Sequence, residues 1–211
     1  MRTRHRDPAE IDHALDRLND IHRQLARGSV FRGYRAKTVA LTGFLALGAA
    51  SVQHFACPAQ GIADYLVFWL GIATAAFTLC AGDILHYVLH SQREGLRRET
   101  RAAVAQFLPA LGAGALMTAA LFQGSHAGLL PGLWSINFGL ALLASRSFLP
   151  RATIAIAVAF MGAGASFLQV IPEGATPSPW FMGLVFGVGN IVLAFFLRLE
   201  NHDEEAGHGT R

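Results

Sequence analysis

Six long apolar runs divide this chain, and they constrain its fold more than any other feature. They cover approximately residues 38–55, 65–88, 102–122, 129–148, 152–171 and 179–198. A helix of about 18 or more apolar residues is long enough to cross the hydrocarbon core of a membrane. Charged residues make up 15% of the chain, whereas a soluble domain carries about 25%. The sequence therefore predicts an all-α, polytopic membrane protein with one transmembrane domain over residues 37–198.

All 17 Lys and Arg residues fall on one side of these runs. They precede the first run, lie between the second and third, flank the loop between the fourth and fifth, or follow the sixth. The other three loops contain none. Positive residues stay cytoplasmic, so both termini are predicted to lie in the cytoplasm. This distribution also accounts for the pI of 9.3, and we expect a lipid bilayer and no nucleic acid as a partner. Short outer loops and the Arg-, Ala-, Gly- and Leu-rich composition are typical of a bacterial inner-membrane protein.

A short motif recurs at the start of three of the runs. Each copy reads Arg-Ala, eight residues, Leu or Met, a small residue, any residue, then Gly-Ala. The copies begin at Arg35, Arg101 and Arg151, all with the same orientation. This spacing predicts three helical hairpins around a pseudo-threefold axis along the membrane normal. The alternative is that the motif reflects composition alone, because small residues are common in membrane helices.

Small residues let transmembrane helices approach closely where lipid provides no hydrophobic drive for association. The repeat places one glycine of each copy near the middle of its helix, and the last run contains a Gly-x-x-x-Gly pair. We therefore predict helix packing at Gly48, Gly114, Gly164, Gly183 and Gly187.

The N-terminal segment 1–36 is predicted to be a basic cytosolic head that contains an amphipathic helix over residues 8–27. The sequence Asp-Pro-Ala-Glu at its start is typical of a helix N-terminus. Ile11, Leu18 and Leu25 follow at heptad spacing, and Asp16 lies on the polar face. Such a stripe either packs on the chain's own helices or binds a protein partner or a second copy. The C-terminal tail, 199–211, is short and acidic and is predicted to be disordered.

Two polar residues in the second run and one just beyond its end form the main candidate for chemistry. At 100° per residue, Asp83, His86 and His90 fall within an arc of about 60° on one helix face. Carboxylate and imidazole are ligands for a divalent transition metal, and an acidic residue inside a membrane helix is a functional candidate. The alternative is an ordinary cytosolic extension of the helix, which holds no metal or other cofactor.

The polar residues expected at mid-membrane depth in the other runs are Ser135 and four amides, Gln106, Asn137, Gln169 and Asn190. Such residues usually form hydrogen bonds between helices. Alternatively, they line a small polar cavity. The contacts that they make therefore bear on whether the protein transports a solute.

Sequence motifs for known enzyme classes are absent. The chain has no phosphate-binding loop, no nucleophile elbow and no His-Glu-x-x-His pair, so no catalytic residue is predicted. Three functions remain. The first is a non-enzymatic scaffold or regulatory subunit that binds a partner through helix 8–27. The second is a small-solute transporter or permease component with a cavity between the hairpins. The third is a metal-dependent membrane enzyme that uses Asp83, His86 and His90.

Overall fold

A computed structural model describes residues 36–90, 94–122, 124–146, 152–172 and 174–208. The described residues are helices and short turns, and they contain no strand. Almost all of the predicted head 1–36, with its helix 8–27, lies outside these ranges.

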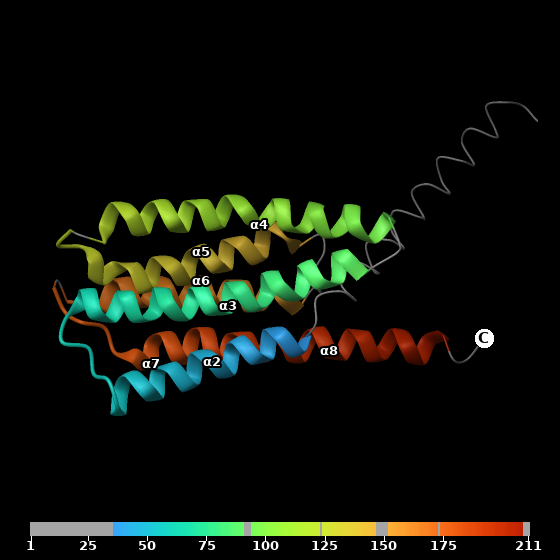
Figure 1. Cartoon of the computed structure of the whole chain (residues 1–211). Helices are drawn as coiled ribbons and strands as arrows, with labels where there is room; N and C mark the ends of the chain where they lie inside the picture. Colours follow the sequence, from blue (N-terminus) through green and yellow to red (C-terminus); the bar gives the residue numbers. More distant parts are fainter. Residues whose placement is uncertain (1–35, 91–93, 123, 147–151, 173, 209–211) are drawn as a thin grey trace, which may run out of the picture.

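The helices alternate in direction along the bundle (Figure 1). Their bounds in chain order are α2 Ala36–Phe55, α3 Ile62–His90, α4 Glu94–Leu121, η2 Ala127–Leu129, α5 Leu130–Ala144, α6 Ala152–Val170, α7 Pro179–Met182, η4 Gly183–Val188 and α8 Gly189–His208. The short η2 is a 3₁₀ turn, and η4 is a π-helical stretch that joins α7 to α8.

Six candidate membrane spans lie within these helices, as the sequence predicted. They are Ala36–Phe55, Ile62–His86, Val104–Leu121, Ala127–Ala144, Ala152–Val170 and Pro179–Leu199. All six are long and apolar enough to cross a bilayer. The fold is that expected of a multi-pass membrane protein.

The ends of several helices differ from the sequence-based expectation. α3 begins at Ile62, and α4 begins at Glu94, well before its apolar run. The segment predicted as a disordered tail after residue 198 is instead helical as far as His208. Helix formation propagates one residue at a time from an existing turn, so an apolar helix can extend into a polar segment.

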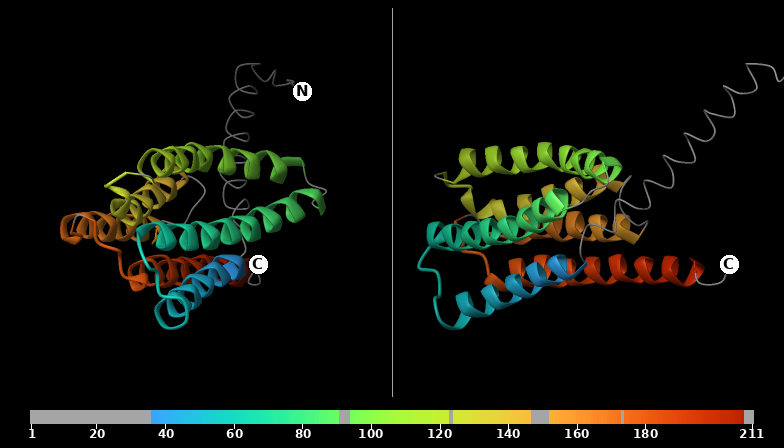
Figure 2. Two further views of the ribbon diagram at one scale, coloured as in Figure 1. Left: turned by 60° about the vertical axis from the view of Figure 1, so that its left-hand side comes forward. Right: turned by 45° about the vertical axis from the view of Figure 1, so that its right-hand side comes forward.

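Two buried clusters form the core. The first joins α2, α3 and α7 around Ala50, Tyr65 and Met182. The second joins α2, α5, α6 and α8 around Val39, Phe160 and Leu197. α4 lies at one edge of the bundle, whereas α2 and α8 lie at the opposite edge (Figures 1 and 2). No residue of the α4 window Val104–Leu121 is buried, so most of this helix surface is available to lipid.

The closest helix pairs lie across the predicted hairpins rather than within them. α5 packs most extensively on α6, and α2 packs most extensively on η4 and α8. α6 and α8, which were predicted to form the third hairpin, touch much less. The structure therefore does not confirm three equivalent hairpins.

Candidate functional site

Asp83 lies where the polar end of α3 meets the first turn of α2. The Thr38 hydroxyl donates a hydrogen bond of 2.8 Å to the Asp83 carboxylate. Both residues are half-buried. A carboxylate removed from water needs hydrogen-bond donors, and Thr38 supplies one from a neighbouring helix. This bond links α2 to α3 at that end of the bundle.

The other two residues of the predicted metal site are only partly described. His86 lies one turn beyond Asp83 and its side chain is exposed. His90 is the last residue of α3, but its side chain lies outside the described set. Among the described side chains, no three His, Cys, Asp or Glu residues are close enough to hold a metal ion. Metal binding by Asp83, His86 and His90 stays a prediction.

The four amide residues do not meet around a common cavity. The Asn137 amide on α5 donates a 2.8 Å hydrogen bond to the Ala110 carbonyl on α4. Asn190 on α8 donates to the Thr42 hydroxyl on α2, at 3.4 Å. Gln106 and Gln169 are exposed. The two asparagines thus join different helix pairs, and the two glutamines face outward.

Two further interhelix hydrogen bonds are buried, and the first of them joins two residues, Gln53 and Trp69, that were not predicted to form such a contact. The Trp69 indole on α3 donates a 2.7 Å hydrogen bond to Gln53 on α2. The Ser135 hydroxyl on α5 donates to the Phe160 carbonyl on α6, at 2.6 Å. Gln53 near the end of the first apolar run and Trp69 near the start of the second were both visible in the sequence. Their pairing required the helix arrangement.

The five predicted packing glycines occupy different environments. Gly183 and Gly187 are buried against α2, and Gly164 is buried against α5. Gly114 is half-buried, and a Cβ built there would lie 2.8 Å from the Asn137 amide nitrogen. Gly48 is exposed, with nothing within 4 Å of such a Cβ. The three repeat glycines therefore share no common contact.

Other glycines at which two helices approach closely are not part of the repeat motif. A Cβ at Gly43 would lie 2.7 Å from the Gly187 carbonyl, so α2 and η4 touch through backbone. A Cβ at Gly139 would lie 2.6 Å from the Ala157 carbonyl. Gly132 and Gly139 are seven residues apart on α5, as are Ala157 and Gly164 on α6. This matched heptad spacing of small residues was the available sequence signal.

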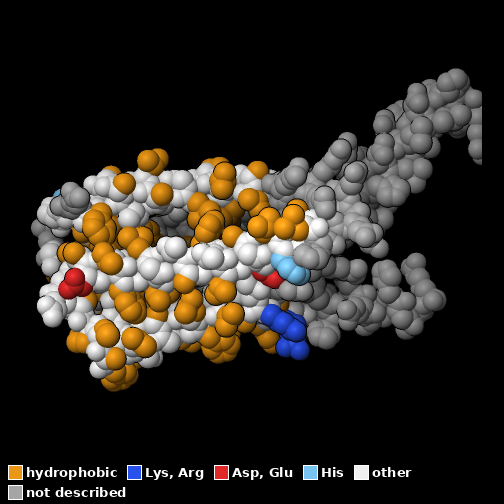
Figure 3. All heavy atoms as spheres, in the orientation of Figure 1, with side chains coloured by type: hydrophobic (Ala, Val, Ile, Leu, Met, Phe, Trp, Pro, Cys, Tyr) orange, Lys and Arg blue, Asp and Glu red, His pale blue; other side chains and the backbone are white. Residues whose placement is uncertain are grey.

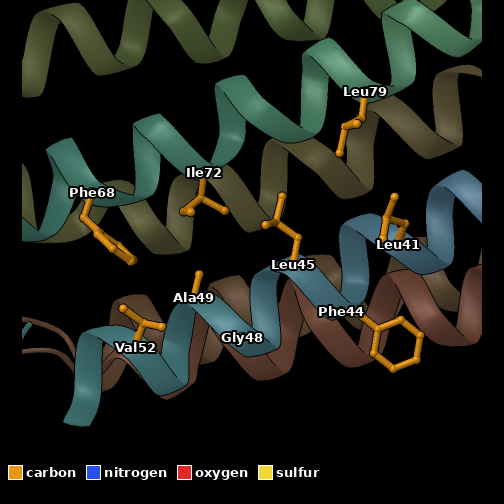
Figure 4. Close-up of a pocket in the computed structure, with 9 residues that line it drawn as sticks. All are labelled: Leu41, Phe44, Leu45, Gly48, Ala49, Val52, Phe68, Ile72 and Leu79. Carbon is orange, nitrogen blue, oxygen red and sulfur yellow. The ribbon is translucent and has the colours of Figure 1, made fainter. Parts of the chain in front are cut away.

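An apolar groove of about 570 Å³ lies between α2 and α3 (Figure 4). Leu45 and Ala49 point from α2 toward α3, and Ile72 and Leu79 point back toward α2. The lining residues are Leu41, Phe44, Leu45, Gly48, Ala49, Val52, Phe68, Ile72 and Leu79. None of the four amide residues is among them.

The two ends of the bundle differ in chemistry. Apolar side chains cover its middle, and charged side chains lie at the ends (Figure 3). Lys37, Arg146 and Arg198 lie where α2 begins, where α5 ends and where the apolar part of α8 ends. The opposite end contains Trp69, Trp134 and Trp180, near the starts of α3, α5 and α7. Tryptophan is enriched at membrane–water interfaces.

The chain matches no protein family, no curated protein and no solved structure to which it was compared.

Proposed function

We propose that this chain is a non-enzymatic membrane scaffold or regulatory subunit, which engages a protein partner through residues 8–27. The observation that supports this proposal is that polar side chains within the bundle form hydrogen bonds between helices. Asn137 and Asn190 form interhelix hydrogen bonds, as do the buried Gln53 and Ser135. Polar groups committed to helix contacts stabilise the bundle and are not arranged around a solute.

The asymmetry of charge supports an orientation with both termini in the cytoplasm of a bacterium. Lys37, Arg146 and Arg198 lie at one end of the described bundle, and positive residues are retained on the cytoplasmic side. The segment 8–27 precedes α2 in the sequence, and α2 begins at this end. Its apolar stripe would therefore be presented to cytoplasmic partners.

The transporter alternative has less support. Transport requires polar groups arranged around a solute pathway near the middle of the membrane. Among the described residues, the groove between α2 and α3 is lined by apolar residues and glycine, and the exposed Gln106 and Gln169 lie on other helices. These features favour a scaffold over a small-solute carrier.

The partner hypothesis is tested by cross-linking and affinity capture of the full chain from its own membranes in mild detergent. The variant Leu18→Asn interrupts the apolar stripe of segment 8–27 and should abolish capture of the partner or of a second copy. The control variant Asp16→Asn introduces the same residue type on the polar face and should leave capture unchanged.

A deletion of residues 1–28 gives the complementary measurement. We expect this shortened chain to insert in the membrane but to lose the partner. Equal capture by the wild type, the Leu18→Asn variant and the shortened chain would show that segment 8–27 does not bind the partner.

A further inference from the structure

Beyond Leu41 and Leu79, at one end of the groove between α2 and α3, polar residues continue the helix faces that line it. On α2, Lys37, Leu41, Leu45, Gly48 and Val52 follow one another at spacings of three or four residues, which places them on one helix face. Lys37 is exposed, and the next four residues line the groove. The apolar stripe of α2 therefore ends in a cation.

The facing stripe of α3 ends in the same region with a carboxylate, opposite in charge to Lys37, and an imidazole. Phe68, Ile72 and Leu79 line the groove, and Asp83 and His86 continue their helix face at spacings of four and three residues. The hydrogen bond from Thr38 to Asp83 closes α2 against α3 beyond Leu41 and Leu79. The groove thus has an apolar trough and a polar end that contains both a cation and a carboxylate.

The dimensions of the trough suit one hydrocarbon chain. At 1.5 Å per residue, the stretch from Leu41 to Val52 is about 16 Å long, which is roughly one leaflet of a hydrocarbon core about 30 Å thick. Its volume of about 570 Å³ is within the range of small-molecule sites, about 300–1,000 Å³. The trough is open beside Gly48, where a built Cβ would meet nothing within 4 Å.

A second transmembrane helix fits this surface less well than a lipid. Close helix pairs use small residues four positions apart. The small residues of α2 that line the groove, Gly48 and Ala49, are adjacent rather than four positions apart. The polar end also presents charges that an apolar helix leaves unmatched.

We propose that this groove, between α2 and α3, binds a phospholipid whose headgroup carries a phosphate and a primary ammonium group, as in phosphatidylethanolamine. One acyl chain occupies the trough from Leu41 to Val52. Lys37 pairs with the phosphate, and the ammonium group donates to Asp83. A carboxylate has about four acceptor positions, so Asp83 can accept from Thr38 and from the lipid together.

The headgroup assignment follows from charge complementarity. A purely anionic headgroup would place further negative charge beside Asp83. A choline headgroup has the same net charge as ethanolamine but no N–H donor for the carboxylate. Each cation near a membrane surface contributes about 1 kcal/mol to lipid attraction, which corresponds to about fivefold in affinity.

The test is native mass spectrometry of the full chain, released from nanodiscs. The nanodiscs contain equal amounts of phosphatidylethanolamine, phosphatidylcholine and phosphatidylglycerol with identical acyl chains. We expect the wild type to retain one lipid, with phosphatidylethanolamine favoured about tenfold over phosphatidylcholine, because only ethanolamine donates a hydrogen bond to the Asp83 carboxylate. Gly48→Leu fills the trough and should lose the retained lipid. Gly162→Leu is the matched control, since Gly162 is also exposed with nothing within 4 Å of a built Cβ.

Two further pairs of variants test the headgroup contacts. Lys37→Gln should lower retention of phosphatidylethanolamine about fivefold, whereas Arg198→Gln, at the same end of the bundle, should not.

Asp83→Asn keeps an acceptor for Thr38 but should abolish the preference for ethanolamine over choline. Asp64→Asn, at the opposite end of α3, is its control. Equal melting temperatures of Gly48→Leu and the wild type would show that the fold is intact.

Three outcomes would overturn the proposal. One is equal lipid retention by the wild type and Gly48→Leu. Another is equal retention of ethanolamine and choline lipids by the wild type. The third is a dimer that carries no lipid and that Gly48→Leu dissociates, which would assign the groove to a second copy of the chain. Loss of partner capture in the Leu18→Asn variant tests a different segment and is independent of these outcomes.

Discussion

At the scale of single residues, Gly162 and Gly164 show how closely spaced positions acquire different roles. Both belong to the same small-residue motif on α6. Gly164 is buried, and a Cβ built on it would lie 2.5 Å from the Gly132 carbonyl. Gly162 is exposed, with nothing within 4 Å. Gly164 therefore allows the antiparallel helix α5 to approach α6 closely, while Gly162 faces outward.

Gly164→Ala should destabilise the protein by about 1–3 kcal/mol, because a methyl group there forces α5 away from α6. Gly162→Ala should leave stability unchanged or raise it by up to about 1 kcal/mol, because alanine favours the helix. Thermal unfolding of the detergent-solubilised variants measures the difference. Equal melting temperatures would contradict the close approach of α5 and α6.

At the scale of helices, α4 is held differently from the rest of the bundle. No residue of its apolar window is buried. Two hydrogen bonds from α5 reach it: Asn137 donates to the Ala110 carbonyl, and the Trp134 indole donates to the Thr118 hydroxyl at 2.9 Å. Gly114 allows the Asn137 side chain to lie against α4. These two hydrogen bonds and an edge-on ring contact between α4 and α5 attach α4 to the bundle.

Asn137→Leu keeps a side chain of similar size but removes the hydrogen bond to α4. Interhelix hydrogen bonds in membranes contribute about 0.6 kcal/mol on average and up to about 1.7 kcal/mol. We expect faster hydrogen–deuterium exchange in α4 and unchanged exchange in α2. Gln169→Leu, at an exposed amide, should alter neither helix. Unchanged exchange in α4 of Asn137→Leu would mean that the Asn137 hydrogen bond does not hold this helix in place.

At the scale of the whole molecule, the bundle has a basic end and an end with three tryptophans. Cys57 is exposed in the turn that follows α2, at the end opposite Lys37 and Arg198. Cys80 lies within α3 and is half-buried. A thiol at Cys57 can therefore report which end of the bundle faces out of the cell.

A membrane-impermeant maleimide should label Cys57 in intact spheroplasts of a Cys80→Ser variant. Positive residues are retained on the cytoplasmic side, so Cys57, at the end opposite them, should face outward. Arg198→Cys, made in a chain with Cys57→Ser and Cys80→Ser, should be labelled only after permeabilisation. The reverse labelling pattern would show that the chain has the opposite orientation.

The sequence by itself determined the six spans. The spans of the structure match the predicted runs to within a few residues, since span length depends on bilayer thickness and on local apolar composition. Those properties are read from consecutive residues. Asp83 also stood out locally, as the acidic residue within an apolar run.

Only the tertiary structure decided how the helices pair. The repeat motif predicted equivalent hairpins, but α2 packs on α8 and α5 packs on α6. It also decided that Asn137 and Asn190 join helices and that Gly48 opens a groove instead of a packing contact. Lipid surrounds every helix with a similarly apolar environment, so hydropathy does not select partners. Shape and hydrogen bonding between distant residues select them.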